Sequence, residues 1–310
     1  MVGRSSLHVL IRRLGALCVL WGVTGCIEGK TRPPDGAGPA ACDWRRGFTL
    51  EAPEPLVELN GAEEDYEPFM TPDGLAIYFA SFRDGTSHQY VASRDRREAR
   101  FSSVRRVFPD VAEGESALSI APDGTVFLAA GWPGGAGQSD IWIARSPSAP
   151  LRSSDFVPLA AVNTQHVEID PFPSADGQRL YLGRRDSPSS THVYISRRGT
   201  DASFGPAELL LGVGNLPGEQ TNPVVTADEQ LIVFSSLRTG STSHDVWYAL
   251  WDQQAGQFTG ARVAPRINHP TSDDRHIYLS SDGCEIIFAS NRPGGAGKLD
   301  LYRSRYSPID

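Results

Sequence analysis

The chain has 310 residues and a formal net charge of −8, with 37 Asp and Glu against 29 Lys and Arg. This acidic balance argues against a protein that binds nucleic acid through its phosphates. The length is sufficient for one large domain.

Residues 1–25 are typical of an export signal. Three arginines precede the apolar run "LGALCVLWGV", which is too short to span a bilayer as a stable helix. The run ends in "VTGC", which resembles a bacterial lipobox. The resemblance implies that Cys26 is lipidated and becomes the first residue of a mature chain; the alternative is an ordinary signal peptide with an unmodified cysteine. Cleavage would remove three positive charges, leaving a net charge of about −11.

Ile27 follows the lipidation cysteine. The lipoprotein sorting pattern places Asp at this position in inner-membrane proteins, so the resemblance implies the outer membrane of a bacterial envelope and leaves open which of its two sides. Residues 26–46 include "IEGKTRPPDGAGPAA", a Pro- and Gly-rich stretch with little to bury. We expect these residues to form a flexible tether.

Residues 47–310 contain a fivefold repeat. Segments such as "PDGLAIYFAS" and "SDGCEIIFAS" place a turn aspartate between two β-rich runs. Asp-Gly suits a tight hairpin because both residues tolerate positive φ. The turn aspartates are Asp73, Asp123, Asp176, Asp228 and Asp282, and they are 50, 53, 52 and 54 residues apart.

Each unit predicts four strands, and the units together predict an all-β, five-bladed propeller. The fourth run of a unit begins near a phenylalanine: Phe101, Phe156, Phe204 and Phe258. The last unit lacks this run, and a matching segment, "FTLEAPEPLVELN" at residues 48–60, stands before the first unit. We expect this N-terminal strand to join the last blade and close the ring, which removes a free sheet edge.

These units resemble the WD40-like β-propeller repeat of the TolB type, through "PDG…IYFAS" and "FASNRPGGAGKLDLY". The resemblance covers residues 47–310. It implies a propeller fold and a place among bacterial envelope proteins. Departures occur in single positions, for example Asp228-Glu229 in place of Asp-Gly and Trp132 where other units have arginine.

The loop "RPGGAGKLD" at 292–300 invites comparison with a phosphate-binding loop. That motif requires a Ser or Thr after the lysine and a helix beyond it, whereas Leu299 and a strand follow Lys298 here. We expect a hairpin instead. Arg292 and Asp300 flank it, and we expect a cross-loop ion pair or a carboxylate that accepts hydrogen bonds from loop amides.

Acidic residues recur just before each turn aspartate. Eight positions before it, four of five units carry an acid, and six positions before it the residues are mostly polar. Because inner strands line the tunnel of a propeller, we expect these side chains to ring one mouth and bind a ligand or a cation. The candidates are Asp65, Glu67, Glu115, Glu168, Asp170, Asp274 and His276. The alternative is that they are solvated residues at the start of a strand. No calcium loop or other metal motif is present, so the sequence assigns no metal site and no cofactor.

No G-x-S-x-G or H-E-x-x-H motif occurs, so we expect no catalysis. We expect a monomeric envelope protein that binds a protein, peptide or glycan and touches the membrane only through its lipid. Two alternatives stay open. Five-bladed propellers include glycoside hydrolases, which need two facing carboxylates, and the chain could also be a purely structural envelope component.

A disulfide between Cys42 and Cys284 is also expected. In a blade whose strands alternate in direction, the second and the outer strand begin at the same end and lie about 10 Å apart. Cys42 precedes the outer strand of the last blade, and Cys284 begins its second strand. Export favours oxidation, whereas a pair of free thiols is the alternative.

Overall fold

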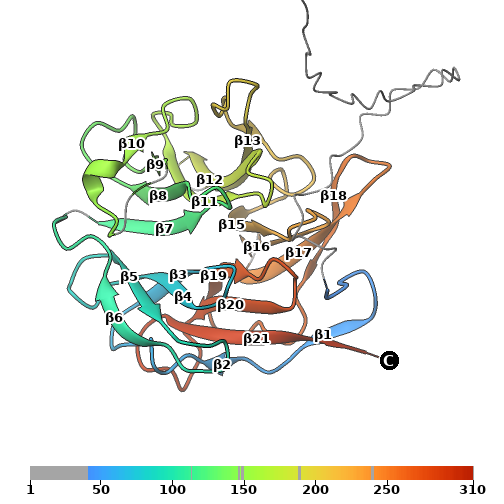
Figure 1. The fold of residues 1–310 in the computed structure, drawn as a ribbon. Coiled ribbons are helices and arrows are strands. Elements are labelled where there is room, and N and C mark those ends of the chain that lie inside the picture. Colours follow the sequence, from blue (N-terminus) through green and yellow to red (C-terminus); the bar gives the residue numbers. More distant parts are fainter. Residues whose placement is uncertain are drawn as a thin grey trace, which may run out of the picture. The chain divides into compact units, whose positions relative to one another are not determined.

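A computed structural model describes residues 41–309 except 113, 146, 148–149, 188–189 and 239–240. The strands form five antiparallel sheets arranged as a five-bladed propeller, which confirms the predicted fold (Figure 1). Each inner strand contacts the inner strand of the next blade, and the last contacts the first. The predicted signal segment and Cys26 lie outside the described residues.

The first four blades each contain four consecutive strands. Blade 1 is β3 (Asp65–Met70), β4 (Ala76–Ser81), β5 (His88–Ser93) and β6 (Ser102–Arg106). Blade 2 is β7 (Glu115–Ile120), β8 (Val126–Ala130), β9 (Asp140–Ala144) and β10 (Val157–Pro158), with a short 3-10 helix, η1 (Ser153–Asp155), before β10. Blade 3 is β11 (Val167–Pro173), β12 (Arg179–Ser187), β13 (Ser190–Arg197) and β14 (Glu208–Leu209). Blade 4 is β15 (Glu219–Val225), β16 (Leu231–Leu237), β17 (Asp245–Asp252) and β18 (Gln257–Val263).

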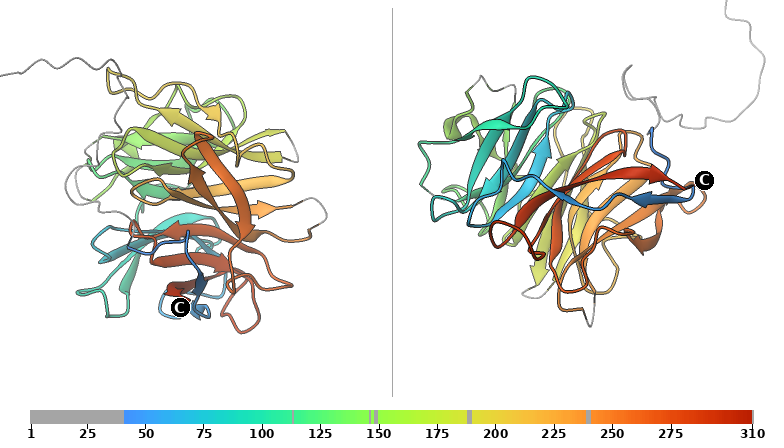
Figure 2. Two further views of the ribbon diagram at one scale, coloured as in Figure 1. Left: turned by 90° about the vertical axis from the view of Figure 1, so that its right-hand side faces the viewer. Right: turned by 90° about the horizontal axis from the view of Figure 1, so that it is seen from below.

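Blade 5 is completed by the N-terminal segment, as predicted. Its own strands are β19 (Asp274–Leu279), β20 (Glu285–Ser290) and β21 (Asp300–Pro308). Two short strands, β1 (Phe48–Leu50) and β2 (Glu54–Pro55), both pair antiparallel to β21. Figure 2 shows the blue N-terminal strand beside the red C-terminal one. The ring is therefore closed by strands from the two ends of the propeller.

The folded region begins before residue 47, where the sequence places the end of the tether. Cys42 forms a disulfide with Cys284, with 5.2 Å between the two Cα atoms. Trp44 is buried and packs against the ring of Phe48, with the ring centroids 4.6 Å apart. Its indole N–H donates to the carbonyl of Gly283 at 2.8 Å. Residues 42–46 thus belong to blade 5, because the disulfide and the tryptophan hold them against it.

The turn aspartates organise the hairpins between inner and second strands. The Asp282 carboxylate accepts hydrogen bonds from the Ser280 hydroxyl and from the backbone N–H of Cys284. The backbone bond recurs in all four other blades, and the hydroxyl bond recurs in blades 1, 3 and 4. The residue after the aspartate has positive φ in all five turns. In blade 4 that residue is Glu229, whose carboxylate accepts hydrogen bonds from Arg179 and Tyr181 of blade 3. These contacts account for a glutamate where the other turns have glycine.

The hydrophobic core lies between adjacent blades. The largest fully buried side chains include Phe79, Phe127, Phe234 and Phe288 of the second strands, and Phe258 of an outer strand. Clusters of aliphatic and aromatic side chains join each blade to its neighbour, for example Leu231 and Val246 of blade 4 with Ile277 of blade 5. Among the described residues, no helix is both long and apolar enough to cross a membrane.

Candidate functional site

Every inner strand contains a β-bulge at its third or fourth residue, six positions before the turn aspartate. The pairing register shifts there in all five blades. The residues at this position have left-handed backbone: Glu67 (φ 50°), Ala117 (51°), Asp170 (55°), Asn222 (49°) and His276 (55°). Such a conformation costs a non-glycine residue about 1–2 kcal/mol, and strain of this kind tends to gather at functional sites.

The bulges bring side chains from four blades together. One donor atom each from Glu67, Asp170 and His276 lies within 4.8 Å of the other two. The His276 Nδ1 is 3.5 Å from the nearer Glu67 oxygen. Asn222 connects the group, because its backbone N–H donates to the Asp170 Oδ2 at 3.0 Å and its side-chain oxygen accepts from the backbone N–H of His276 at 3.3 Å. We call Glu67, Asp170, Asn222 and His276 the axial cluster.

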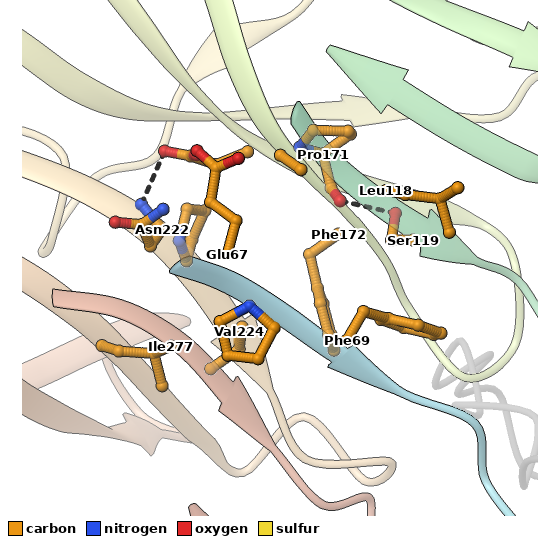
Figure 3. A pocket seen from close by; sticks show the side chains of 13 residues that line it. Glu67, Phe69, Leu118, Ser119, Pro171, Phe172, Asn222, Val224 and Ile277 are labelled. Carbon is orange, nitrogen blue, oxygen red and sulfur yellow. Dashed lines mark hydrogen bonds between the residues drawn. The ribbon is translucent and has the colours of Figure 1, made fainter. Parts of the chain in front are cut away.

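A cavity of about 40 Å³ lies among the inner strands beside the axial cluster. Figure 3 shows Glu67 and Asn222 at one end of it, with Phe69, Phe172 and Val224 lining the rest. The volume suits one or two water molecules or a single ion. It is far below the 300–1,000 Å³ of ordinary pockets for small organic ligands.

Burial shifts the acid–base properties of the axial cluster. It raises the pKa of Glu67 to about 8, with the nearby Asp170 charge as a further cause. It also raises the pKa of Asp170, to about 6. Burial lowers the pKa of His276 well below its ordinary value, helped by the positive charge of Arg275. Burial therefore disfavours charge on each of these groups.

We call the residues two positions before the bulges the first-position residues, and the acids among them do not join the axial cluster. Asp65, Glu168 and Asp274 are fully buried, and each forms an ion pair within its own blade, with Arg83 (2.6 Å), Arg184 (2.8 Å) and Arg292 (2.7 Å) respectively. A regular strand would direct residues two apart to the same side. The bulge breaks that alternation, so the expected single ring of acids separates into two sets.

These acid–arginine pairs fasten each blade to the loop before it. The Asp274 carboxylate also accepts from the backbone N–H of His269, and Arg292 donates to the carbonyl of Ile267. The same arrangement recurs in blades 1 and 3. Of the two arrangements expected for Arg292 and Asp300, the structure has the second, because the Asp300 carboxylate accepts from the loop N–H of Gly297 at 3.1 Å. The sequence analysis did not predict these acid–arginine pairs, although an acid stands 16 to 18 residues before the arginine in three units.

Blades 2 and 4 replace this pair by other contacts. Glu115 is buried and lies 3.1 Å from His88 of blade 1, and burial raises its pKa to about 7. In blade 4, the Gln220 amide donates to the carbonyl of Gly218 at 2.8 Å, and Arg238 stacks on Trp247. All five first-position residues therefore have structural partners inside the propeller.

The Gly-rich loops are packing elements rather than anion sites. A Cβ at Gly297 would lie 2.4 Å from the carbonyl oxygen of Glu63 in the chain segment leading into blade 1, so only glycine permits this close approach. The loop N–H of Gly297 is engaged by Asp300, and Lys298 pairs with the Glu63 carboxylate at 2.9 Å. No helix follows the loop, since β21 begins at Asp300.

A larger hollow lies at the seam where blade 5 meets blade 1. This seam cleft has a volume of about 490 Å³. Four arginines line it, two from each blade: Arg94, Arg97, Arg303 and Arg305. Arg97 is exposed and is held by backbone carbonyls of the first hairpin turn. Acids, among them Glu98 and Glu285, also line the cleft, so it concentrates charge of both signs within an acidic chain.

No protein-family model matches this sequence, and none of the curated proteins matches it either. Solved structures do. A thermostable family-43 glycoside hydrolase is 13% identical, with 84% of this chain and 94% of that chain covered and a TM-score of 0.58. The catalytic domain of the Coprinopsis cinerea GH62 α-L-arabinofuranosidase is 13% identical, with 87% and 98% covered and a TM-score of 0.53.

TolB from Acinetobacter baumannii is also among the similar structures, at 17% identity and a TM-score of 0.48. The match covers 79% of this chain and 55% of that chain, so the present chain corresponds to about half of that protein. At these identities the likenesses establish a shared propeller fold alone. They do not separate a binding protein from an enzyme.

Proposed function

We propose that this chain is a non-catalytic, lipid-anchored protein of the bacterial envelope whose propeller binds a protein, peptide or glycan partner. The observation that carries the proposal is the contrast between the two hollows. The axial cavity, where the carboxylates converge, has a volume of about 40 Å³, whereas the seam cleft has about 490 Å³. Of these two hollows, the seam cleft is the one with room for a side chain or a sugar unit of a macromolecular partner.

The seam cleft also suits a partner with negatively charged groups. The cleft gathers four arginines in a chain whose net charge is −8. Arginine binds carboxylates and sulfated or phosphorylated groups through paired N–H donors. The cleft adjoins the disulfide, since Cys284 lines it. The disulfide and the paired strands of blade 5 hold this edge rigid, which reduces the entropy lost on binding.

The alternative is a glycoside hydrolase, because two glycoside hydrolases share the propeller fold. That chemistry needs two carboxylates that flank a sugar, with room for the ring between them. The carboxylates of Glu67 and Asp170 converge beside a cavity that holds only a few atoms. The first-position acids are buried within blades. This arrangement supports binding over hydrolysis.

A binding assay against acidic peptides and acidic oligosaccharides tests the proposal. We expect the full-length chain to bind a member of this panel, and Arg97→Glu combined with Arg305→Glu to weaken that binding at least about tenfold. Arg100→Glu combined with Arg145→Glu is the matched control, because both arginines are exposed outside the cleft. Release of reducing sugar from arabinan by the wild type, lost in Glu67→Gln, would favour the hydrolase instead.

Anchoring is tested separately at Cys26. Cells that express the full chain and receive labelled palmitate should yield a labelled protein in the outer-membrane fraction. Cys26→Ala should remove both the label and the membrane association. An unlabelled protein that is soluble after cell lysis would contradict lipidation and leave the binding proposal intact.

A further inference from the structure

We propose that the axial cluster is a binding site for a divalent transition-metal cation of the Mn²⁺ or Zn²⁺ type. The site would use Glu67, Asp170 and His276 as ligands, with the Asn222 side-chain nitrogen 3.3 Å from the His276 Nδ1. It does not depend on partner binding at the seam cleft.

The first argument is convergence. Three blades contribute one donor atom each, and these atoms lie within 4.8 Å of one another. Ligand–metal distances of about 2.0–2.2 Å place donors on opposite sides of one ion about 4–4.4 Å apart. A small side-chain adjustment therefore brings all three into contact with a single ion. The left-handed bulges are what bring residues of separate blades to this point.

The second argument is that each cluster carboxylate has one buried oxygen without a hydrogen-bond donor, although the two carboxyl groups also contact each other. Asp170 is 7% exposed, and its Oδ1 has no hydrogen-bond donor. The Glu67 side chain is 9% exposed, and its Oε2 likewise has none. Buried carboxylates normally have a hydrogen bond or a counter-ion, because burying an unpaired charge is costly. Arg275, whose positive charge acts on both carboxyl groups, forms its ion pair with Asp273 at 2.9 Å.

The donor types select the metal. Two carboxylates with an imidazole form a mixed oxygen and nitrogen set. Imidazole favours first-row transition ions over Mg²⁺, which prefers oxygen ligands and water. The apolar side chains of Phe69 and Phe172 line the cavity beside the cluster (Figure 3), which lowers the local polarity and strengthens the electrostatic attraction. We therefore expect Zn²⁺ to bind more tightly than Mn²⁺, and Mg²⁺ weakly.

Calorimetric titration of the EDTA-treated full-length chain with ZnCl₂, MnCl₂ and MgCl₂ tests this. We expect one equivalent of Zn²⁺ or Mn²⁺ to bind. A free metal concentration of 100 times Kd should raise Tm by about 5 °C. Asp170→Asn retains an oxygen that can accept the Asn222 N–H, and it should lower the affinity at least about 100-fold. His276→Gln should reduce Zn²⁺ binding more than Mg²⁺ binding.

Glu115→Gln is the matched control. Glu115 is equally buried but lies outside the axial cluster, so this variant should retain the stoichiometry and the affinity. If Asp170→Asn does not fold, Glu67→Gln replaces it with the same expectation. Absence of saturable one-equivalent binding to the wild type would overturn the proposal, as would an equal loss in Glu115→Gln and the axial variants.

Discussion

Replacing the disulfide cysteines measures how strongly the ring is held closed. Cys42 and Cys284 are 242 residues apart, so their bond restricts almost the whole propeller in the unfolded state. The chain-entropy relation gives about 5.5 kcal/mol for a loop of this length at 25 °C. That is a large part of the 5–15 kcal/mol typical of folded proteins. We expect Cys42→Ser with Cys284→Ser to lower the free energy of unfolding by about 5 kcal/mol and Tm by about 10 °C.

Urea unfolding followed by near-ultraviolet circular dichroism provides the measurement. Three samples are compared: the oxidised full-length wild type, the double variant and the wild type under reducing conditions. The two samples without the disulfide should have similar m-values, and both should have a lower urea midpoint than the oxidised wild type. A loss below about 1 kcal/mol in both samples would refute the entropic reasoning. Alkylation of both thiols in the native, unreduced protein would refute the bond itself.

Three further predictions concern single residues. Arg292→Met leaves Asp274 buried without its partner and should lower the free energy of unfolding in urea by about 3–5 kcal/mol. As the control, Arg262→Met at an exposed position should lower it by less than about 0.5 kcal/mol. Equal losses in the two variants would refute a stabilising role for the Arg292–Asp274 pair. Burial raises the pKa of Glu115 from 4.5 to about 7, so the folded state retains a proton that the unfolded state loses between these pH values. Stability should therefore fall as pH rises through this window, and Glu115→Gln should recover about 3 kcal/mol at pH 8 relative to pH 4; an unchanged pH profile would contradict the shift. Ala117 has φ 51°, so Ala117→Gly should raise the free energy of unfolding by about 0.5–1 kcal/mol, and a decrease would show that the bulge carries no strain.

The blade count and the ring closure could be predicted because local chemistry specifies them. Each Asp73-type turn needs residues that tolerate positive φ, and each turn separates two strands with alternating apolar residues. The segment at 48–60 has the same pattern as the missing fourth strand, and an unpaired edge beside β21 leaves one place for it. Periodicity and counting are sufficient for this inference.

The division of the acids into two sets could not be predicted in the same way. Glu67 and Asp65 are two residues apart, which in a regular strand means one shared face. Only the bulge separates them, and the five bulged residues have no common side chain. One signal was available: proline follows the bulged residue at Pro68, Pro171 and Pro223, and proline within an inner strand marks a bulge.

Crystals of the full-length chain soaked in MnCl₂ or ZnCl₂ would show what the axis holds. Data collected on either side of the metal absorption edge should give one anomalous difference peak on the propeller axis, within about 2.0–2.3 Å of the Glu67, Asp170 and His276 donor atoms. A soaked crystal of Asp170→Asn should lack the peak. An axis that shows only water or empty density in the wild type, with metal bound elsewhere, would contradict the assignment of the bulged residues to a cation site.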